Sequence, residues 1–200
     1  MARLTRAESQ AQTRDRLIAT AKRAFLRDGY AATTLEKVAD EAGYSKGAVY
    51  SNFRNKDELC LAVLDAIHTE QMIRIGTAIA GTGTLDERLA AFQRWADDTI
   101  GERSWTALEV EFAIHTRHDP RLRDELARRD EGIRAVIAGV LAEGAAEFGL
   151  RLPMPAQDLA TALLSLGIGL GVRRAIDPSI PASVLTDTIR ALAGRPSDAG

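Results

Sequence analysis

The chain has 200 residues, of which 46% are hydrophobic and 27% are charged, and its formal net charge at pH 7 is −2. These values are typical of an ordinary soluble globular protein of one or two domains with a substantial core. The single cysteine, Cys60, excludes a disulfide framework within the chain and favours a reducing compartment. Cys60 lies in an apolar helical stretch, so we interpret it as a core residue; the alternative is a thiol sensor.

Charge is distributed unevenly along the chain. Residues 1–56 hold eleven Lys or Arg and six Asp or Glu, a net charge of +5. Residues 57–200 hold 15 basic and 22 acidic residues, a net charge of −7. A basic end on an acidic body fits a polyanion-binding domain attached to a domain with another task. The alternative is a chance segregation of charges on solvated faces.

No sign of export or membrane insertion is found in the sequence. The N-terminal residues lack the apolar stretch of a secretory signal, and no segment approaches the ~20 uninterrupted apolar residues of a membrane span. We therefore expect a cytoplasmic protein.

Residues 1–55 are predicted to form a small three-helix domain, which we call the head. It begins with a loose basic arm over residues 1–6. From residue 7 to residue 28, Leu17 and Phe25 lie on one apolar stripe of a helix. Gly29 ends this helix, because glycine adopts the left-handed conformation at a helix C-terminus without strain.

Two short helices are expected after this first one. Thr33 is predicted to cap the earlier of them, with Glu36 three residues later completing a capping box. Gly43 suits the left-handed position that ends this helix, and Ser45 suits the N-cap of the next, which we expect to run to about Phe53. Two short helices joined by a turn with a glycine form a helix-turn-helix, whose second helix can enter the major groove of DNA.

The identity of the residues in this turn narrows the interpretation further. The segment AGYSKGAVYSNF, followed by a lysine, resembles the DNA-binding signature of TetR-type bacterial transcriptional regulators. The residues that carry the resemblance are Ala42, Gly43, Tyr44, Ser45, Lys46, Gly47, Ala48, Tyr50, Phe53 and Lys56. Two positions depart from the family pattern. Asn52 stands where His or Tyr is frequent, and Tyr44 stands where a smaller aliphatic residue is usual.

A head of this kind is expected to contact DNA through its helix starts. Hydroxyls, backbone amides and lysines there bind phosphates, whereas side chains of the second helix read base edges. The expected phosphate contacts are Thr33, Thr34, Ser45, Tyr50 and Lys56. At the base edges, Lys46 is expected to bind guanine and Asn52 adenine, while Gly47 and Ala48 keep the helix close to the bases.

Residues 56–200 are predicted to form a second, all-helical domain, which we call the body, so that the whole chain is all-α with about nine helices. Asn55 and Glu58 resemble a capping pair at the start of a long helix that runs to about Ala80. This helix is long enough to connect the head with the body, and the GTGT segment at 81–84 ends it. Further helices are expected at 85–100, 105–116, 120–148, 156–176 and 182–193, followed by a frayed tail.

The helix expected at 156–176 is nearly all apolar and contains three glycines, Gly167, Gly169 and Gly171. A dinucleotide-binding loop would need a preceding strand and a different glycine spacing, and neither is present. An apolar helix with little polar face is buried on several sides, so we predict that this helix and the last one form a two-fold, four-helix interface with a second copy. TetR-type proteins, which the chain resembles, dimerise at this place. The expected interface residues are Leu163, Leu166, Gly167, Leu170, Gly171, Arg174, Leu185 and Ile189.

Nothing in the sequence indicates catalysis, a cofactor or a metal site. His115 and His118 are three residues apart, but a metal site needs three or four convergent ligands. Paired carboxylates such as Glu109 and Glu111 diverge on one helix. We therefore expect no enzyme, although convergence of distant residues remains an alternative.

The TetR resemblance implies a small-molecule effector bound in the body. Large aromatic residues with a few polar groups are the usual lining of such a pocket; the alternative for each residue is an ordinary place in the core. The expected pocket residues are His68, Gln71, Met72, Trp95, Trp105, Phe112 and His115.

The resulting functional hypothesis is a ligand-responsive DNA-binding regulator. It would bind a palindromic DNA operator as a homodimer, most simply as a repressor, and a small-molecule effector would release it. Activation is the alternative within this class. The alternative from another class is a small-molecule-binding helical protein or enzyme whose head is only structural.

Overall fold

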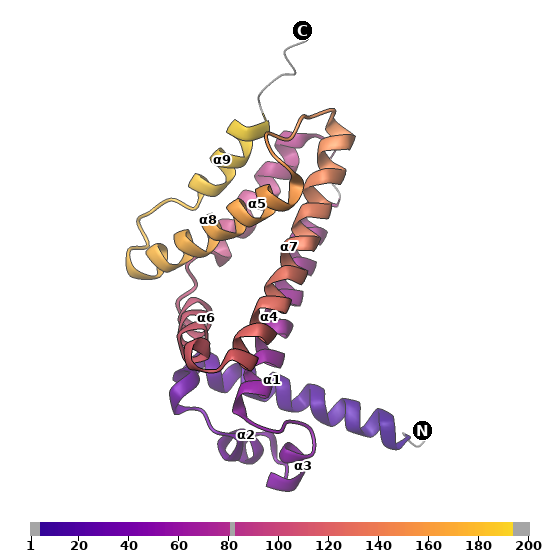
Figure 1. Cartoon of the computed structure of the whole chain (residues 1–200), viewed down its shortest axis with the longest axis vertical. Coiled ribbons are helices and arrows are strands. Elements are labelled where there is room, and N and C mark those ends of the chain that lie inside the picture. Colours follow the sequence, from indigo (N-terminus) through magenta and orange to yellow (C-terminus); the bar gives the residue numbers. More distant parts are fainter. Residues whose placement is uncertain (1–4, 81–82, 194–200) are drawn as a thin grey trace. The chain divides into compact units, whose positions relative to one another are not determined.

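The structure is a computed structural model that describes residues 5–80 and 83–193. Over these residues it contains nine α-helices, one short 3-10 helix and no strand (Figure 1). The all-α prediction is thereby confirmed. The helices are α1 (Arg6–Ala32), α2 (Leu35–Ala42), α3 (Lys46–Tyr50), α4 (Lys56–Ile79), α5 (Leu85–Thr99), α6 (Arg103–His115), α7 (Pro120–Phe148), α8 (Ala156–Ile176) and α9 (Ser183–Ala193), with the 3-10 helix at Thr116–His118.

These helices form two compact units. Unit 1 comprises the described chain up to Glu70 together with Ala107–Arg123. Unit 2 comprises Gln71–Thr106 and the described chain from Asp124 onward. The domain boundary after residue 55 stays a prediction. Residues 1–4 of the expected arm, 81–82 of the GTGT segment and the tail from 194 lie outside the described residues.

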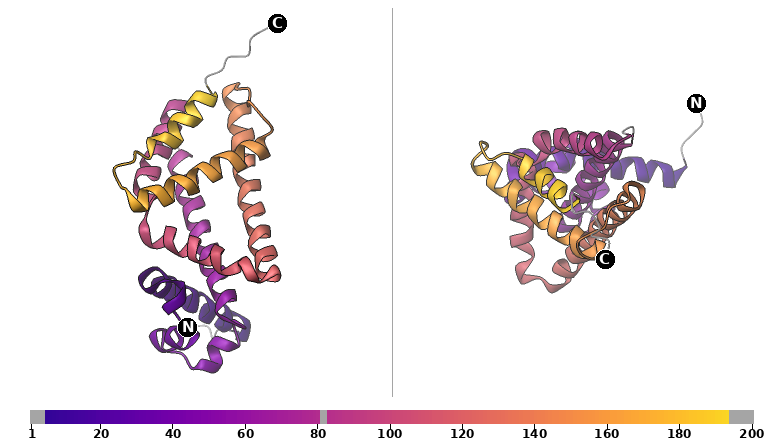
Figure 2. Two further views of the ribbon diagram at one scale, coloured as in Figure 1. Left: turned by 60° about the vertical axis from the view of Figure 1, so that its left-hand side comes forward. Right: turned by 90° about the horizontal axis from the view of Figure 1, so that it is seen from above.

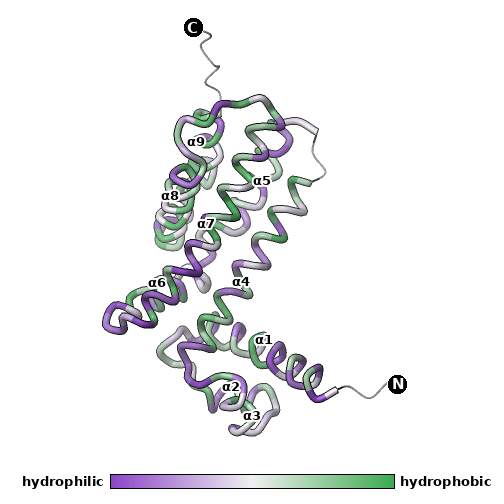
Figure 3. Tube along the Cα trace, turned by 45° about the vertical axis from the view of Figure 1, so that its right-hand side comes forward, coloured by the Kyte–Doolittle hydropathy of each residue, from purple (hydrophilic) through white to green (hydrophobic). Residues whose placement is uncertain are grey.

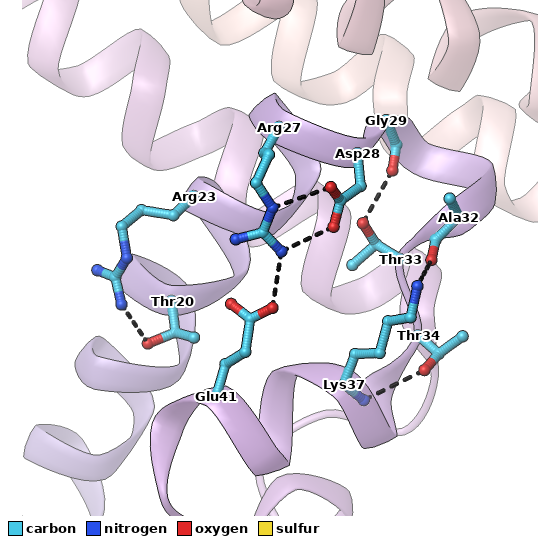
Figure 4. Close-up of polar contacts among 10 residues, drawn as sticks. All are labelled: Thr20, Arg23, Arg27, Asp28, Gly29, Ala32, Thr33, Thr34, Lys37 and Glu41. Carbon is cyan, nitrogen blue, oxygen red and sulfur yellow. Dashed lines mark hydrogen bonds and ion pairs between the residues drawn. The ribbon is translucent and has the colours of Figure 1, made fainter.

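The start of α2 differs from the prediction by one residue. Thr34, not Thr33, is the N-cap, and its Oγ1 accepts a hydrogen bond from the backbone N–H of Lys37 at 3.2 Å. Thr33 is fully buried, and its hydroxyl donates to the carbonyl oxygen of Gly29 at 2.8 Å (Figure 4). The capping box predicted at Thr33 was wrong because this hydroxyl closes the end of α1 instead.

Gly29 and Gly43 break the helical path as expected. Gly29 has φ 80° and ψ 172°, which interrupts α1, but one more helical turn follows it up to Ala32. Gly43 ends α2 in the left-handed conformation, with φ 71° and ψ 31°. Helix α3 stops at Tyr50, three residues before the predicted end at Phe53.

The core of unit 1 joins α1, α2 and α3 with the first half of α4 and with α6. Helix α2 packs against α1 and α3, as the views in Figures 1 and 2 show. Four apolar side chains of the head are at most 1% exposed and form its core: Phe25, Val38, Val49 and Phe53. From α6, the buried ring of Phe112 meets the ring of Tyr30 edge-on, with 5.4 Å between centroids.

Unit 2 is built around α5, α8 and α9, with α9 packed against both of the others (Figure 2). Apolar residues run along α8 (green in Figure 3), and Leu159, Leu163 and Leu170 from this helix are buried with Ala96 and Leu185 in one cluster. By length and composition α8 passes the test for a membrane span among the described helices. A core helix of a soluble protein can have the same length and composition, so this feature of α8 is only weak evidence for a membrane span.

Among the glycines of unit 2, Gly101, in the connection between α5 and α6, has the least room for a side chain. Gly101 has φ 91°, and a Cβ atom added there would lie 2.4 Å from Cβ of Arg174 on α8. The three glycines of α8 have more room within the chain. A Cβ at Gly167 or Gly171 would meet other atoms only at ordinary contact distances, and one at Gly169 would meet none within 4 Å.

The residues predicted for a dimer interface lie mostly on the side of α8 and α9 that faces the core of unit 2. Leu163, Leu170, Gly171 and Leu185 are buried, Leu166 and Ile189 pack against the buried cluster, and Gly167 lies next to Leu185. The guanidinium of Arg174 donates to the carbonyl oxygen of Ile100 at 2.7 Å. The four buried residues are thus occupied by the core of unit 2, because an all-apolar helix does not reveal in its sequence which face meets its own core. The half-buried Leu166, Gly167, Arg174 and Ile189 stay predicted interface residues. The exposed large apolar residues of these two helices are Ile168, Ile176 and Val184.

Candidate nucleic-acid interface

The first turn of α3 is open to solvent. Ser45 caps the helix, its Oγ accepting a hydrogen bond from the backbone N–H of Ala48 at 3.2 Å, as the sequence predicted. Ser45, Lys46 and Gly47 are exposed, and Ala48 is half-buried. This turn therefore presents one charged side chain and two small residues, which leaves room for a close approach of a large partner.

The first turn of α2 is also exposed at its cap, Thr34. The ammonium group of Lys37 donates to the carbonyl oxygen of Ala32 at 2.8 Å, which ties α2 to the end of α1 (Figure 4). Nearby, the guanidinium of Arg27 bridges the carboxylates of Asp28 and Glu41, each at 2.7 Å. These polar contacts fix α2 on α1, so the cap of α2 is held in a defined place.

Tyr50 connects α3 with α2. Its ring is half exposed, and its hydroxyl donates to the carboxylate of Glu36 at 3.0 Å. This hydrogen bond raises the pKa of Tyr50, while the backbone N–H of Glu36 and then the Tyr50 hydroxyl lower the pKa of Glu36. A phosphate oxygen that approached the Tyr50 hydroxyl would therefore compete with a charged carboxylate. Sequence reasoning missed this pair because 14 residues separate its members.

Asn52 is held by several hydrogen bonds on the C-terminal side of α3. Its amide nitrogen donates to the carbonyl oxygen of Ala48 at 2.8 Å. Its backbone carbonyl oxygen accepts a hydrogen bond from Arg14 at 2.7 Å, and the guanidinium of Arg14 lies 4.2 Å from the ring centroid of Phe53. Arg14, on α1, thus positions the residues that follow α3.

The side chain of Lys56 contacts the C-terminal end of α1. Its ammonium group donates to the carbonyl oxygen of Tyr30 at 3.0 Å and lies 4.0 Å from the centroid of the Tyr30 ring. A cation at a helix C-terminus is stabilised by the unpaired carbonyl groups there. Lys56 therefore has a structural role in addition to the DNA contact predicted for it.

A polar network in unit 1 joins α1, α4 and α6. The Tyr30 hydroxyl donates to the carboxylate of Asp57, and Nε2 of His115 lies 3.0 Å from the oxygens of both residues. The backbone N–H of Tyr30 donates to the Glu111 carboxylate at 2.8 Å. Burial, followed by the bond to Asp57, raises the pKa of Tyr30, so its hydroxyl stays a donor at neutral pH. No local pattern could have revealed these partners, which are 27 to 85 residues apart.

The seven residues predicted for an effector pocket belong to both units. In unit 1, Nε2 of His68 lies 2.6 Å from Oε1 of Glu109, and the rings of Phe112 and His115 are 6.1 Å apart. In unit 2, the indole N–H of Trp95 donates to Oε1 of Gln71 at 3.1 Å, so the structure brings these two residues together. Met72 and Trp105 are half-buried in the same unit.

Unit 2 has a surface hollow of about 400 Å³ between α4 and α5. Trp95 is the one predicted pocket residue that lines it, and the sequence missed the others. Among them, Ile73 and Arg74 come from α4, and Arg94 and Asp98 come from α5. Since Arg94 and Asp98 are four residues apart, they share a helix face. This face lines the hollow only because α5 lies beside α4 in the tertiary structure.

Cys60 is fully buried, and burial raises the pKa of its thiol. A buried, protonated thiol is unreactive, which agrees with its interpretation as a core residue. Within the described part of the chain, no three or more His, Cys, Asp or Glu side chains gather into a group that could hold a metal ion.

The helix-turn-helix of α2 and α3 can now be compared with known proteins. Residues 17–63 match the model of the bacterial regulatory proteins of the tetR family. Residues 85–195, more than half of the chain, match the model of the C-terminal part of BetI-type transcriptional repressors. The chain belongs to the TetR family. Members of this family are DNA-binding transcriptional regulators rather than enzymes.

Individual relatives agree with this assignment to the TetR family. The HTH-type transcriptional regulator TtgR of Pseudomonas putida is 47% identical over 68 residues, which are 34% of this chain and 32% of TtgR. The match thus spans about a third of that curated relative. The HTH-type transcriptional repressor Rv1474c of Mycobacterium tuberculosis is 29% identical over 125 residues, 62% of each chain.

The fold is that of solved TetR structures. The crystal structure of a TetR transcription regulator from Haloarcula marismortui superposes with a TM-score of 0.70 at 22% identity, covering 92% of this chain and 97% of that one. The resemblance drawn from the residues around Gly43 is confirmed by the two family models.

Proposed function

We propose that the chain is a dimeric repressor that binds a palindromic operator through the head (residues 1–55) and is released when a small effector binds the body (residues 56–200). The observation that carries the proposal is the exposed first turn of α3, Ser45–Ala48, in a segment with a net charge of +5. A basic surface with an open helix start suits a phosphate backbone and a major groove. The protein would act in the cytoplasm.

In the head and at Lys56, the first residue after it, different residues carry affinity and sequence preference. We assign phosphate contacts to Thr34, Ser45, Tyr50 and Lys56, and base contacts to Lys46 and Asn52. Gly47 and Ala48 keep the backbone of α3 close to the base edges. Thr33 leaves the set, because its side chain is fully buried and its hydroxyl is bonded to Gly29.

Asn52 must change partner to read a base. Its amide nitrogen donates to the carbonyl oxygen of Ala48, and a bidentate contact with adenine uses both the nitrogen and the oxygen of the amide. The carbonyl of Ala48 lies in the last turn of α3, where water can replace the amide. The exchange therefore replaces the hydrogen bonds of the amide nitrogen to the Ala48 carbonyl and the Ser51 hydroxyl by two directed ones to the base.

Dimerisation through α8 and α9 would place two heads on successive major grooves, about 34 Å apart. The apolar side chains available for this contact are Ile168 and Ile176 on α8 and Val184 on α9, which are 50%, 79% and 40% exposed. Exposed apolar side chains on one pair of helices favour burial against a second copy.

Effector release follows from differential affinity. A ligand that binds the DNA-free arrangement of the body more tightly than the DNA-bound one shifts the population away from DNA, with a coupling free energy of about 1–3 kcal/mol. The polar network of Tyr30, Asp57 and His115 ties α6 to the ends of α1 and α4 within unit 1. Movement of α6 would therefore act directly on the head.

The proposal is tested by the binding of the purified protein to duplex DNA from upstream of its own coding region, measured by fluorescence anisotropy at several salt concentrations. We expect nanomolar binding that weakens steeply with salt, because phosphate contacts release counterions. Weak binding without sequence preference would favour the alternative of a small-molecule-binding protein whose head is structural.

A further inference from the structure

The hollow between α4 and α5 in unit 2 has the size of a small-molecule site. Its volume of about 400 Å³ lies within the ~300–1,000 Å³ of ligand pockets. Ile73 and the half-buried ring of Trp95 supply apolar wall. The Trp95 ring also lies against Phe92, with 5.2 Å between centroids, so it forms a supported, flat platform.

One buried residue fixes two sides of the hollow. The side-chain oxygen of Gln71 accepts hydrogen bonds from the indole N–H of Trp95 at 3.1 Å and from a guanidinium nitrogen of Arg74 at 3.3 Å. Gln71 is 9% exposed and does not line the hollow itself. Its amide thus holds an aromatic ring and a cation in place before any ligand arrives, which lowers the entropic cost of binding.

The charged groups of the hollow have unused binding capacity. Arg74 spends one N–H on Gln71, and the side chains of Arg94 and Asp98 form no hydrogen bond or ion pair with another described residue. Two guanidinium groups and one carboxylate give the hollow a net charge of +1. Guanidinium groups recognise carboxylates through paired N–H donors, and the single positive excess matches one negative charge.

We propose that this hollow is the effector site and that its ligand is an amphipathic monoanion, an apolar or aromatic body carrying one carboxylate. The apolar part of the ligand lies on Trp95 and Ile73, and its carboxylate binds Arg94 and Arg74. Asp98 disfavours ligands with a second negative charge. The inference rests on the proposed function in one respect, that ligand binding releases the protein from DNA.

The probe pair is 2-naphthoate and its neutral isostere 2-naphthamide, titrated calorimetrically into the full-length protein. We expect one naphthoate per chain and at least tenfold weaker binding of the amide. Arg94→Ala and Arg74→Ala should each weaken naphthoate binding at least tenfold and leave amide binding unchanged. Arg103→Ala is the matched control, because Arg103 is an exposed arginine of unit 2 outside the hollow, and it should bind both probes as the wild type does.

Equal affinity for the two probes, or naphthoate binding that survives both arginine substitutions, overturns the site. Operator affinity measured without the probe distinguishes a failure of the proposed site from a failure of the proposed function. Intact operator binding with no arginine-dependent naphthoate binding refutes only the site, whereas absence of operator binding refutes the proposed function and leaves the calorimetry interpretable. Naphthoate that binds through the arginines but does not weaken operator binding refutes its role as an effector.

Discussion

The hydroxyl of Tyr30 donates a hydrogen bond to the carboxylate of Asp57, and this contact is one step of a link from α1 through α4 to His115 on α6. Tyr30 is 7% exposed, and its backbone N–H and carbonyl oxygen are both bonded to side chains, those of Glu111 and Lys56. One residue of α1 thus receives contacts from two other helices of unit 1. Removing its hydroxyl tests the link without changing the packing of the ring.

We expect Tyr30→Phe to lower the free energy of unfolding by about 1–3 kcal/mol, because a partly buried carboxylate loses a hydrogen bond. Urea denaturation at fixed protein concentration measures the change. Tyr50→Phe is the control, since it also removes a hydroxyl bonded to a carboxylate, but at a half-exposed ring. If both substitutions cost the same, the network around Tyr30 contributes nothing special to stability.

Gly101 and Gly139 provide a second pair for stability measurements. Gly101→Ala places a Cβ against Arg174 at a left-handed backbone position, and we expect a loss of about 3 kcal/mol or more from strain and overpacking together. Gly139 lies within α7 with nothing near its Cβ position, so Gly139→Ala should stabilise the protein by up to about 1 kcal/mol. Thermal denaturation of the two variants should therefore shift in opposite directions, and shifts in the same direction contradict the geometry at Gly101.

Substitutions of Lys56 and Asn52 test whether different residues determine DNA affinity and sequence preference. Lys56→Ala should weaken binding to every duplex and reduce the slope of log K against log salt by about 1. It should also destabilise the head, because the Tyr30 carbonyl loses its partner. Asn52→Ala should change the ranking of operators instead, with a loss of about 1–3 kcal/mol confined to duplexes that carry the preferred base. Equal losses on all duplexes for both variants would refute this division of roles.

A charge on the exposed face of α8 should weaken the dimer. Ile176→Asp places a carboxylate at a side chain that is 79% exposed in the single chain, and two-fold symmetry brings it into the interface twice. Sedimentation equilibrium should show a dimer for the wild type and a shift to the single-chain mass for the variant. Ile114→Asp, on α6, is the control at a 54% exposed isoleucine and should remain dimeric. A wild type that sediments as one chain ends the dimer proposal.

Local chemistry made much of the fold predictable from the sequence. The bounds of α7 and α8 agree with the prediction at both ends, because Pro120, Gly149 and Pro155 mark three of those ends within a few residues. The left-handed turn at Gly43 and the cap at Ser45 were predicted for the same reason. Each of these features depends on residues that are neighbours in the chain.

The features that could not be predicted from the sequence depend on contacts between residues that are far apart in the chain. Thr33 and Thr34 are both good caps, and only the carbonyl of Gly29, which takes the Thr33 hydroxyl, decides between them. Likewise, Leu163 and Ile168 are both strongly apolar, and only the packing of α8 against α5 and α9 buries the first and exposes the second. The contacts of Gln71 with Trp95 and of Tyr30 with His115 depend on tertiary structure in the same way.

The most direct test of the account is selection of random-sequence duplex DNA by the purified full-length protein, followed by sequencing of the bound fragments. We predict enrichment of an inverted repeat whose half-sites are centred about one helical turn apart, and loss of that enrichment in Lys46→Ala. A selection that enriches no sequence, or one that enriches the same repeat with the Lys46 side chain removed and affinity unchanged, would contradict the claim that the first turn of α3 reads DNA.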